Sequence, residues 1–111
     1  MMTSVALKDI PVMTADEMSE HAESAARLLK ALANPHRLQV LCVLGMDEMS
    51  VSELNERIPL SQSALSQHLA KLRVDNLVET RRASQTIYYR TKSGVALELI
   101  RVLQAHFCPN R

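Results

Sequence analysis

Two neighbouring segments, LSQSALSQHLAKLR (residues 60–73) and LVETRRASQTIYYRT (residues 77–91), predict a helix that runs into a β-hairpin. On a helical wheel of about 100° per residue, Leu69 and Leu72 lie within about 40° of Leu65. Ser63 and Gln67 point to the opposite side. The helix is therefore expected to have an apolar inner seam and an outer face of short, uncharged polar side chains.

The outer face of this predicted helix suits the edges of DNA bases in a major groove. Ser and Gln side chains both donate and accept hydrogen bonds, and the small Ala residues between them allow close approach. An ordinary solvated surface helix would more often carry Glu and Lys. The residues that we expect to contact bases are Gln62, Ser63, Ser66 and Gln67.

The hairpin is a second, independent signal. β-Branched and aromatic residues flank the polar stretch RRASQ (residues 81–85), which suits a turn. Two adjacent arginines at a hairpin tip favour contacts with phosphates or a minor groove, and we expect Arg81, Arg82 and Gln85 to make them. The alternative is that both arginines are solubilising charges on an exposed turn. A recognition helix followed by a basic wing predicts a winged helix-turn-helix.

Length and charge fit a single DNA-binding domain. With 111 residues, 47% of them hydrophobic, the chain can build one core but not a second. The formal net charge is only +1, yet residues 1–60 carry five Lys or Arg against nine Asp or Glu, whereas residues 61–92 carry six against two. The positive charge gathers in the recognition segments, where it would orient the protein on a polyanion. The weak overall charge indicates that affinity needs specific contacts and two subunits.

The sequence gives no sign of a membrane or export segment. It has no run of 18 apolar residues, and its first residues, MMTSVALKDIPVM, lack a basic region followed by a long hydrophobic stretch. We therefore expect no membrane association and a cytoplasmic location.

Caps and prolines divide the chain into elements. We expect a flexible arm in residues 1–13, a DNA-binding and dimerisation domain in residues 14–108, and a short tail in residues 109–111. The predicted order within the domain is α-α-α-α-β-β-α, mainly α-helical with a β-hairpin wing. The helices are expected over residues 14–32, 35–44, 52–58, 61–73 and 93–107.

Three helix ends carry specific signals. Thr14 and Glu17 form the T-x-x-E pattern of a capping box. Gly45 is expected to stop the second helix, because glycine is the usual residue just past a helix C-terminus. Ser50 and Ser52 are alternative caps for the third helix.

The combined pattern resembles the ArsR/SmtB family of winged-helix regulators. The resemblance rests on LLKALANPHRLQVLCVL (residues 28–44), SVSELNERIPLSQSALSQHLAKLR (residues 50–73) and TIYYR (residues 86–90), and it covers nearly the whole chain. It implies a bacterial homodimeric repressor of a roughly palindromic operator. It also implies that the first and last helices form the dimer interface, and that the protein leaves DNA when an inducer binds or reacts.

The sequence departs from the metal-sensing members of that family. Ser50 and Ser52 stand near the start of the third helix, where such members carry thiolates, and neutral hydroxyls are poor ligands for zinc or arsenic. The last helix offers only Glu98 and His106 as conventional donors. We therefore expect no metal and no cofactor.

The two cysteines are the reactive residues that remain. The positions of Cys42 and Cys108 resemble those of a cysteine pair in the BigR/HlyU-like subgroup, whose members respond to sulfide and redox state. This resemblance implies a dithiol switch. A thiolate at either position can be oxidised to a persulfide and condense with the other cysteine to a disulfide or polysulfide. Reactive sulfur species are therefore the expected inducer. The alternative for Cys42 is an ordinary buried core thiol.

The same residues bear on three other functions: a metal sensor, a winged helix that binds protein, and an enzyme. A metal sensor would use Cys42, Cys108 and His106. A winged helix that binds protein rather than DNA is disfavoured by the positive charge around the Ser/Gln face. An enzyme is not expected, because no nucleophile, base and orienting acid form a recognisable set.

Overall fold

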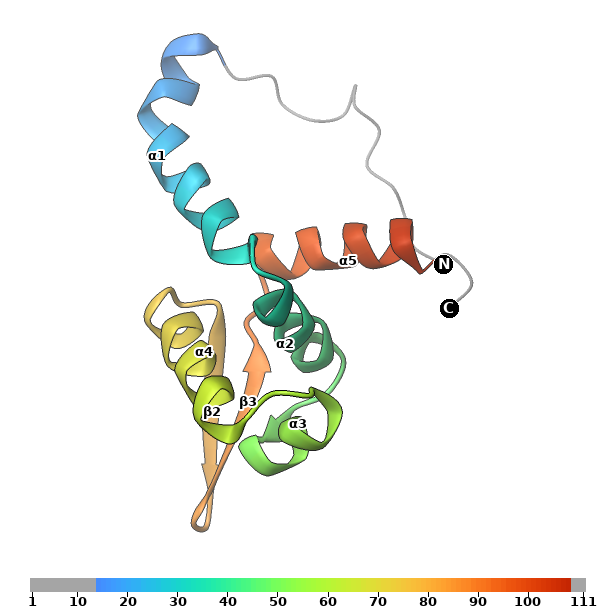
Figure 1. The fold of residues 1–111 in the computed structure, drawn as a ribbon. Coiled ribbons are helices and arrows are strands. Elements are labelled where there is room, and N and C mark those ends of the chain that lie inside the picture. The colour runs from blue at the N-terminus through green and yellow to red at the C-terminus, as the bar shows by residue number, and fades with distance from the viewer. Residues whose placement is uncertain (1–13, 109–111) are drawn as a thin grey trace.

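A computed structural model describes residues 14–108, so the expected arm (residues 1–13) and tail (residues 109–111) lie outside the described residues. Its elements, in chain order, are α1 (Ala15–Leu32), α2 (Pro35–Met46), β1 (Met49–Ser50), α3 (Val51–Arg57), α4 (Gln62–Val74), β2 (Val78–Ala83), β3 (Thr86–Thr91) and α5 (Val95–Phe107). Figure 1 shows the β2–β3 hairpin projecting beside α4, with α1 extending in the opposite direction. The predicted winged helix-turn-helix is confirmed, with β1 as an additional short strand.

Polar side chains cap the N-termini of three helices. The Thr14 hydroxyl accepts a hydrogen bond of 3.1 Å from the Glu17 amide, which is one half of the expected capping box. The Ser61 hydroxyl accepts one of 3.1 Å from the Ala64 amide. A two-way capping box is formed by Ser50 and Glu53, each side chain accepting from the other's backbone N–H. Ser50 is thus the cap of α3.

The expected end of the second helix at Gly45 is wrong, because α2 continues to Met46. Gly45 lies inside α2 and faces a side chain of α5, so its role is in packing rather than in ending the helix. A Cβ placed on Gly45 would lie 3.0 Å from Cδ1 of Leu97 on α5, so the missing side chain leaves room for the Leu97 side chain between α2 and α5.

A small antiparallel sheet joins the wing to the body of the domain. Its strand order is β1-β3-β2, with Met49 opposite Tyr89 and Val78 opposite Thr91. The sequence did not predict β1, because two residues are too short to show an alternating pattern. This strand fixes the start of α3 beside the wing.

The tip of the wing is shorter than expected. Residues 81–85 were expected to form a turn, but β2 extends to Ala83, and the turn consists of Ser84 and Gln85. Ser84 has a φ of 58°, which the tight reversal requires. The two arginines are therefore strand residues, with Arg81 opposite Tyr88 and Arg82 opposite Ile87.

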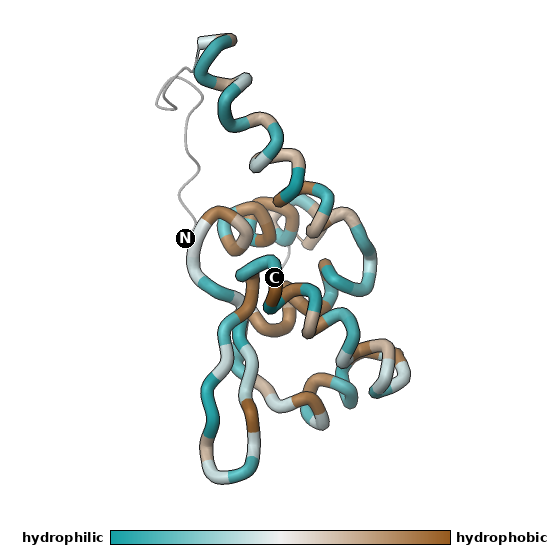
Figure 2. Tube along the Cα trace, turned by 90° about the vertical axis from the view of Figure 1, so that its left-hand side faces the viewer, coloured by the Kyte–Doolittle hydropathy of each residue, from teal (hydrophilic) through white to brown (hydrophobic). Residues whose placement is uncertain are grey.

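The core lies where α2, α3, α4 and α5 meet the sheet. Its fully buried side chains are Val40, Leu41, Leu44, Leu54, Leu65, Leu69, Leu72 and Ile100. Hydrophobic residues gather in the middle of the molecule, whereas much of α1 and the wing is hydrophilic (Figure 2). A buried hydrogen bond of 2.8 Å, from the Thr91 hydroxyl to the Leu41 carbonyl, ties β3 to α2.

Two helices leave apolar side chains uncovered. In α1 only Ala31 and Leu32 are buried, both at its C-terminal end. The exposed large apolar residues of α1 and α5 are Met18, Leu29, Val95, Val102, Leu103 and Phe107. None of the helices within residues 14–108 is long and apolar enough to cross a membrane.

Candidate nucleic-acid interface and cysteine pair

Helix α4 presents the polar face that its sequence predicts. Leu65, Leu69 and Leu72 are at most 1% exposed and pack into the core. The residues expected to contact bases, Gln62, Ser63, Ser66 and Gln67, are all exposed. Their outward placement agrees with the prediction, and their contacts with bases remain a prediction.

The turn between α3 and α4 is held by Asn55. Its side-chain amide donates a hydrogen bond of 2.7 Å to the Leu60 carbonyl and a longer one of 3.5 Å to the Ile58 carbonyl. The hydroxyl of Ser61 then caps α4. These contacts fix the angle at which α4 leaves α3, and a fixed angle is what a helix-turn-helix needs to present one helix to a groove.

Arg81 and Arg82 point to opposite faces of the wing, although the sequence predicts the same role for both. Successive strand residues point to opposite faces, so Arg82 shares a face with Ile87 and Tyr89, whereas Arg81 shares the other face with Tyr88. Tyr89 lines a hollow together with Ser66, Ala70, Arg73 and Val74 of α4. Arg82 therefore lies on the face of the wing that is turned towards α4.

On the far face of the wing, Arg81 is already paired. Its Nε donates a hydrogen bond of 3.0 Å to Oε1 of Glu48, its Nη2 also contacts this carboxylate, and the guanidinium lies 4.8 Å from the centre of the Tyr88 ring. The hydrogen bond from Arg81 holds the pKa of the Glu48 carboxyl below its ordinary value. Arg90 is paired with Glu79 at 2.8 Å. Within residues 14–108, Arg82 has no carboxylate partner, and this leaves it free for a ligand.

Two histidines meet where α2 and α4 come together. The rings of His36 and His68 lie 5.8 Å apart, so His68 packs at the edge of the recognition helix. Burial lowers the pKa of His68, and the charges of Arg37 and His36 lower it further. The sequence gave no signal for this contact, because the two residues are far apart in the chain.

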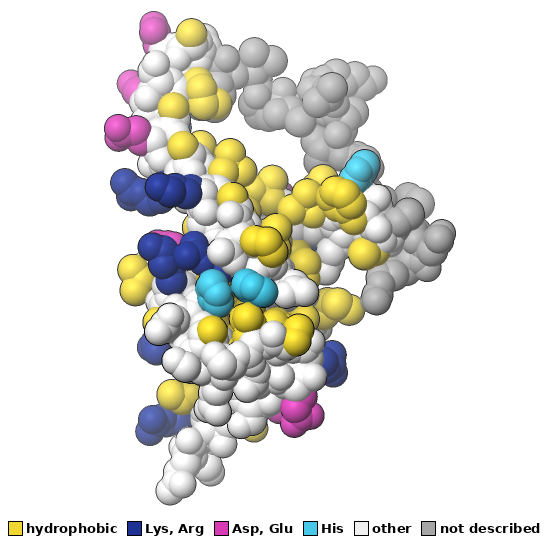
Figure 3. Space-filling model, in the orientation of Figure 1, with side chains coloured by type: hydrophobic (Ala, Val, Ile, Leu, Met, Phe, Trp, Pro, Cys, Tyr) yellow, Lys and Arg dark blue, Asp and Glu magenta, His cyan; other side chains and the backbone are white. Residues whose placement is uncertain are grey.

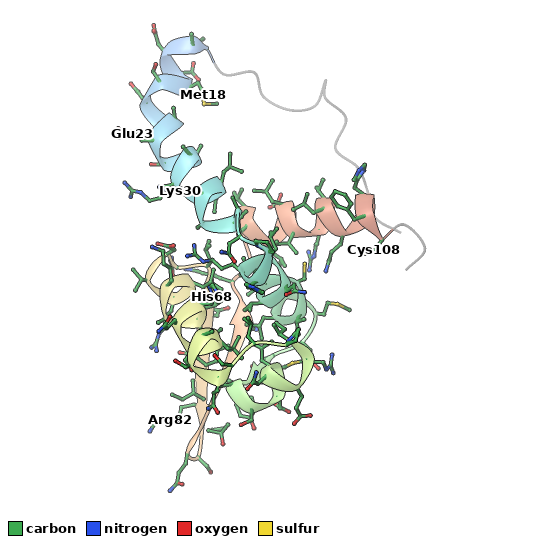
Figure 4. All side chains as sticks on the ribbon, viewed as in Figure 1. Met18, Glu23, Lys30, His68, Arg82 and Cys108 are labelled. Carbon is green, nitrogen blue, oxygen red and sulfur yellow. The ribbon has the colours of Figure 1, made fainter. Side chains whose placement is uncertain are left out.

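The fold brings the two cysteines near enough for Cys108 to affect the pKa of the Cys42 thiol. Cys42 is half-buried on α2. Cys108 is exposed directly after α5 (Figure 4). The Cys108 amide donates a hydrogen bond of 2.8 Å to the Gln104 carbonyl, which places Cys108 one helical turn beyond Gln104. Burial raises the pKa of the Cys42 thiol, a hydrogen bond from the Gln104 side chain opposes this shift, and the nearby Cys108 adds to it.

His106, the third residue of the alternative metal set, lies against an aromatic ring. His106 packs edge-on against Phe107, with ring centres 4.6 Å apart. Over residues 14–108, no three His, Cys, Asp or Glu side chains gather closely enough to hold a metal ion. The described part of one subunit thus brings together Cys42 and Cys108 without a third ligand.

An exposed polar helix on a fixed helix-turn-helix, with a basic wing beside it, defines a winged helix-turn-helix DNA-binding protein. Residues 34–80 match the group described as "Bacterial regulatory protein, arsR family". The transcriptional activator HlyU of Vibrio cholerae is 49% identical over 102 residues, which cover 92% of this chain and 94% of that protein. The biofilm growth-associated repressor of Xylella fastidiosa is 41% identical over 99 residues, which cover 89% and 87%.

Solved structures show the same relationship. The transcriptional regulator HlyU from Vibrio vulnificus has a TM-score of 0.80 at 49% identity, and the match covers 86% of this chain and 100% of that one. A homodimeric winged helix-turn-helix DNA-binding domain from Mycobacterium bovis has a TM-score of 0.71 at 28% identity, with 90% and 93% covered. The chain belongs to the arsR family of bacterial regulatory proteins. It is a transcriptional regulator and, as expected, not an enzyme.

Proposed function

We propose that the protein is a homodimeric repressor that binds a roughly palindromic operator and releases it when Cys42 and Cys108 are oxidised by reactive sulfur species. Each α4 enters a major groove, where Gln62, Ser63, Ser66 and Gln67 contact bases. Arg82 and Gln85 contact the adjacent backbone or minor groove, and Arg81 joins them after it leaves Glu48. Binding to chromosomal DNA places this activity in the cytoplasm.

The uncovered apolar side chains of α1 and α5 support the dimer. Monomeric proteins rarely leave large apolar patches in water, and Leu29, Val102 and Phe107 are 56%, 60% and 73% exposed. The homodimeric relative from Mycobacterium bovis supports the same assembly. A two-fold axis between two α4 helices leads to inverted half-sites in the operator. Light scattering at micromolar concentration tests this part, and a monomer would contradict it.

The relation between Cys42 and Cys108 is the observation that supports redox control. Cys108 follows Gln104 by one turn, and both Gln104 and Cys108 are close enough to Cys42 to shift the pKa of its thiol. The exposed thiol meets an oxidant first, whereas Cys42 is sheltered on a core helix. A covalent link between them would tie α2 to the end of α5. Because α5 belongs to the proposed dimer interface, the link would change the spacing of the two α4 helices.

The sulfur chemistry needs no other co-reactant than a low-molecular-weight persulfide, RSSH. The Cys108 thiolate attacks the outer sulfur of RSSH, which gives the Cys108 persulfide and releases RS⁻. Cys42 then attacks the Cys108-bound sulfur, which closes a disulfide and releases HS⁻. If Cys42 has also become a persulfide, its terminal sulfur makes the same attack and closes a trisulfide, again with release of HS⁻. In both routes the two cysteines are oxidised and one persulfide sulfur is reduced to sulfide. The trisulfide route consumes a second RSSH, whose outer sulfur stays in the bridge.

Operator affinity before and after persulfide treatment tests the mechanism. The wild type is expected to bind in its reduced form and to lose affinity after treatment. Cys42→Ser and Cys108→Ser are each expected to bind and to keep binding after treatment. Equal loss of affinity in all three proteins would rule out the cysteine pair. Mass spectrometry of the treated wild type distinguishes a disulfide from a trisulfide.

Two further assays decide the alternative functions. A metal sensor would retain stoichiometric zinc through purification and lose it after thiol alkylation. A winged helix that binds only proteins would fail to shift any genomic fragment at controlled salt concentration.

A further inference from the structure

Four cationic side chains from three helices surround an open hollow at the C-terminal end of α4. We call it the basic hollow: Arg27 and Lys30 come from the end of α1, Arg37 from the start of α2, and Lys71 from the last turns of α4. Asp75 is the carboxylate that lines it. The ion pairs found within residues 14–108 both lie on the wing, so no carboxylate pairs with these four cations.

The fold holds the positively charged side chains of the basic hollow near one another. The guanidinium of Arg37 donates a hydrogen bond of 3.5 Å from Nη1 to the Ala31 carbonyl, whereas its Nε is buried and has no acceptor among the described residues. The adjacent His68 has a lowered pKa, partly because Arg37 and His36 repel a further positive charge. An anion on this surface would relieve that repulsion.

The basic hollow lies at the C-terminal end of α4, whereas the wing runs beside α4 and carries Arg82 towards the other end of the helix. Figure 4 shows Lys30, His68 and Arg82 following one another along one side of the molecule. The space-filling view in Figure 3 places lysines and arginines of this side on the same face as the two histidines. A helix in a major groove has a phosphate backbone on each side, and the groove is about 12 Å wide. Cations separated along α4, in the basic hollow and on the wing, match this arrangement when the helix enters the groove at an angle, because its two ends then point towards opposite backbones.

We propose that the basic hollow binds backbone phosphates of the DNA duplex that α4 enters, on the side of the major groove opposite the wing. This proposal rests on the proposed DNA-binding function and extends it to α1 and α2, which carry no base-reading residue. Phosphate contacts of this kind fix the register of the protein and add affinity for any sequence. The main alternative occupant is an acidic protein segment, and binding of polyglutamate distinguishes it from DNA.

The salt dependence of binding to a mixed-sequence DNA duplex of about 40 base pairs tests the proposal, because this length accommodates both subunits of a dimer. Each phosphate contact contributes about 0.9 to the slope of log affinity against log salt. Lys30→Gln and Lys71→Gln are each expected to reduce that slope by about 1.8 per dimer, because each removes one contact per subunit. Both residues are exposed, so we expect both variants to fold, as circular dichroism will show.

The matched control is Arg101→Gln, which removes one charge from an exposed position on α5, outside the basic hollow. It is expected to leave the slope unchanged. An unchanged slope for Lys30→Gln and Lys71→Gln, or an equal decrease in the control, overturns the proposal while the wild type still binds DNA. Wild-type affinity for DNA combined with selective loss of polyglutamate binding in both variants would assign the hollow to an acidic protein. If the wild type binds no duplex, including its own promoter region, the proposed function fails as well.

Discussion

Replacement of Thr91 by valine tests the link between the wing and the helix that carries Cys42. The Thr91 hydroxyl is buried and donates a hydrogen bond of 2.8 Å to the Leu41 carbonyl. We expect Thr91→Val to lower the free energy of unfolding by about 1 kcal/mol, the net contribution of a neutral hydrogen bond. A larger loss is not expected, because valine has nearly the same shape and the Leu41 carbonyl can keep its partner within α2.

The assay is thermal or urea unfolding of the reduced protein at one fixed concentration, because association changes the apparent stability of a dimer. For a domain of this size, a loss of about 1 kcal/mol lowers Tm by about 4 °C. Thr86→Val is the matched control, since Thr86 lies on the same strand but is exposed. It should change the stability by less than about 0.5 kcal/mol.

Two results would refute this reasoning. One is a Thr91→Val protein as stable as the wild type, which would mean that the hydroxyl contributes nothing beyond the methyl group. The other is an equal loss in Thr86→Val, which would assign the effect to strand propensity rather than to the bond with α2. With the expected outcome, the hydrogen bond between β3 and α2 contributes to the stability of the domain.

Three further predictions concern DNA contacts and thiol reactivity. Gln67→Ala is expected to weaken specific operator binding by about 1 to 3 kcal/mol without loss of stability, and normal operator binding would show that α4 is oriented differently. In salt titrations, Arg82→Ala should reduce the affinity for many DNA sequences and flatten the slope more than Arg81→Ala, because Arg81 is held by a carboxylate; the reverse order would contradict the assignment of the two wing faces. Gln104→Leu removes a polar side chain whose influence lowers the pKa of the Cys42 thiol, so the pH profile of Cys42 alkylation should move to higher pH, and alkylation at neutral pH should be slower; an unchanged profile would exclude this influence.

The recognition elements could be predicted because their signals are local. The spacing of Leu65, Leu69 and Leu72 defines the buried side of α4, and it leaves Ser63 and Gln67 outside without any knowledge of the rest of the fold. The hairpin is similarly marked by β-branched and aromatic residues on both sides of a polar turn.

Features that depend on contacts between distant segments were missed. Strand β1 exists because Met49 and Ser50 pair with β3, about 40 residues further along the chain. The different surroundings of Arg81 and Arg82 follow from where the turn begins, which is three residues later than the sequence suggested. Glu48 became the partner of Arg81 only through the folded sheet.

Gly45 was misread for the same reason. Its sequence context is that of a helix stop, whereas its role is set by Leu97 in another helix. A glycine that ends a helix and a glycine that admits a neighbouring helix look alike in one sequence.

The position of Gly45 also bears on the chemical selectivity of the proposed switch. It lies one turn from Cys42 on α2, and its contact Leu97 lies two turns before Gln104 on α5, so the glycine is part of the packing between the two helices that position the thiols. A methyl group at this position would displace the Leu97 side chain and disturb the packing that holds the thiols near each other. A direct disulfide tolerates little extra distance, whereas each added sulfur lengthens the reach of the bridge. The packing at Gly45 would then influence how many sulfur atoms the bridge between Cys42 and Cys108 contains.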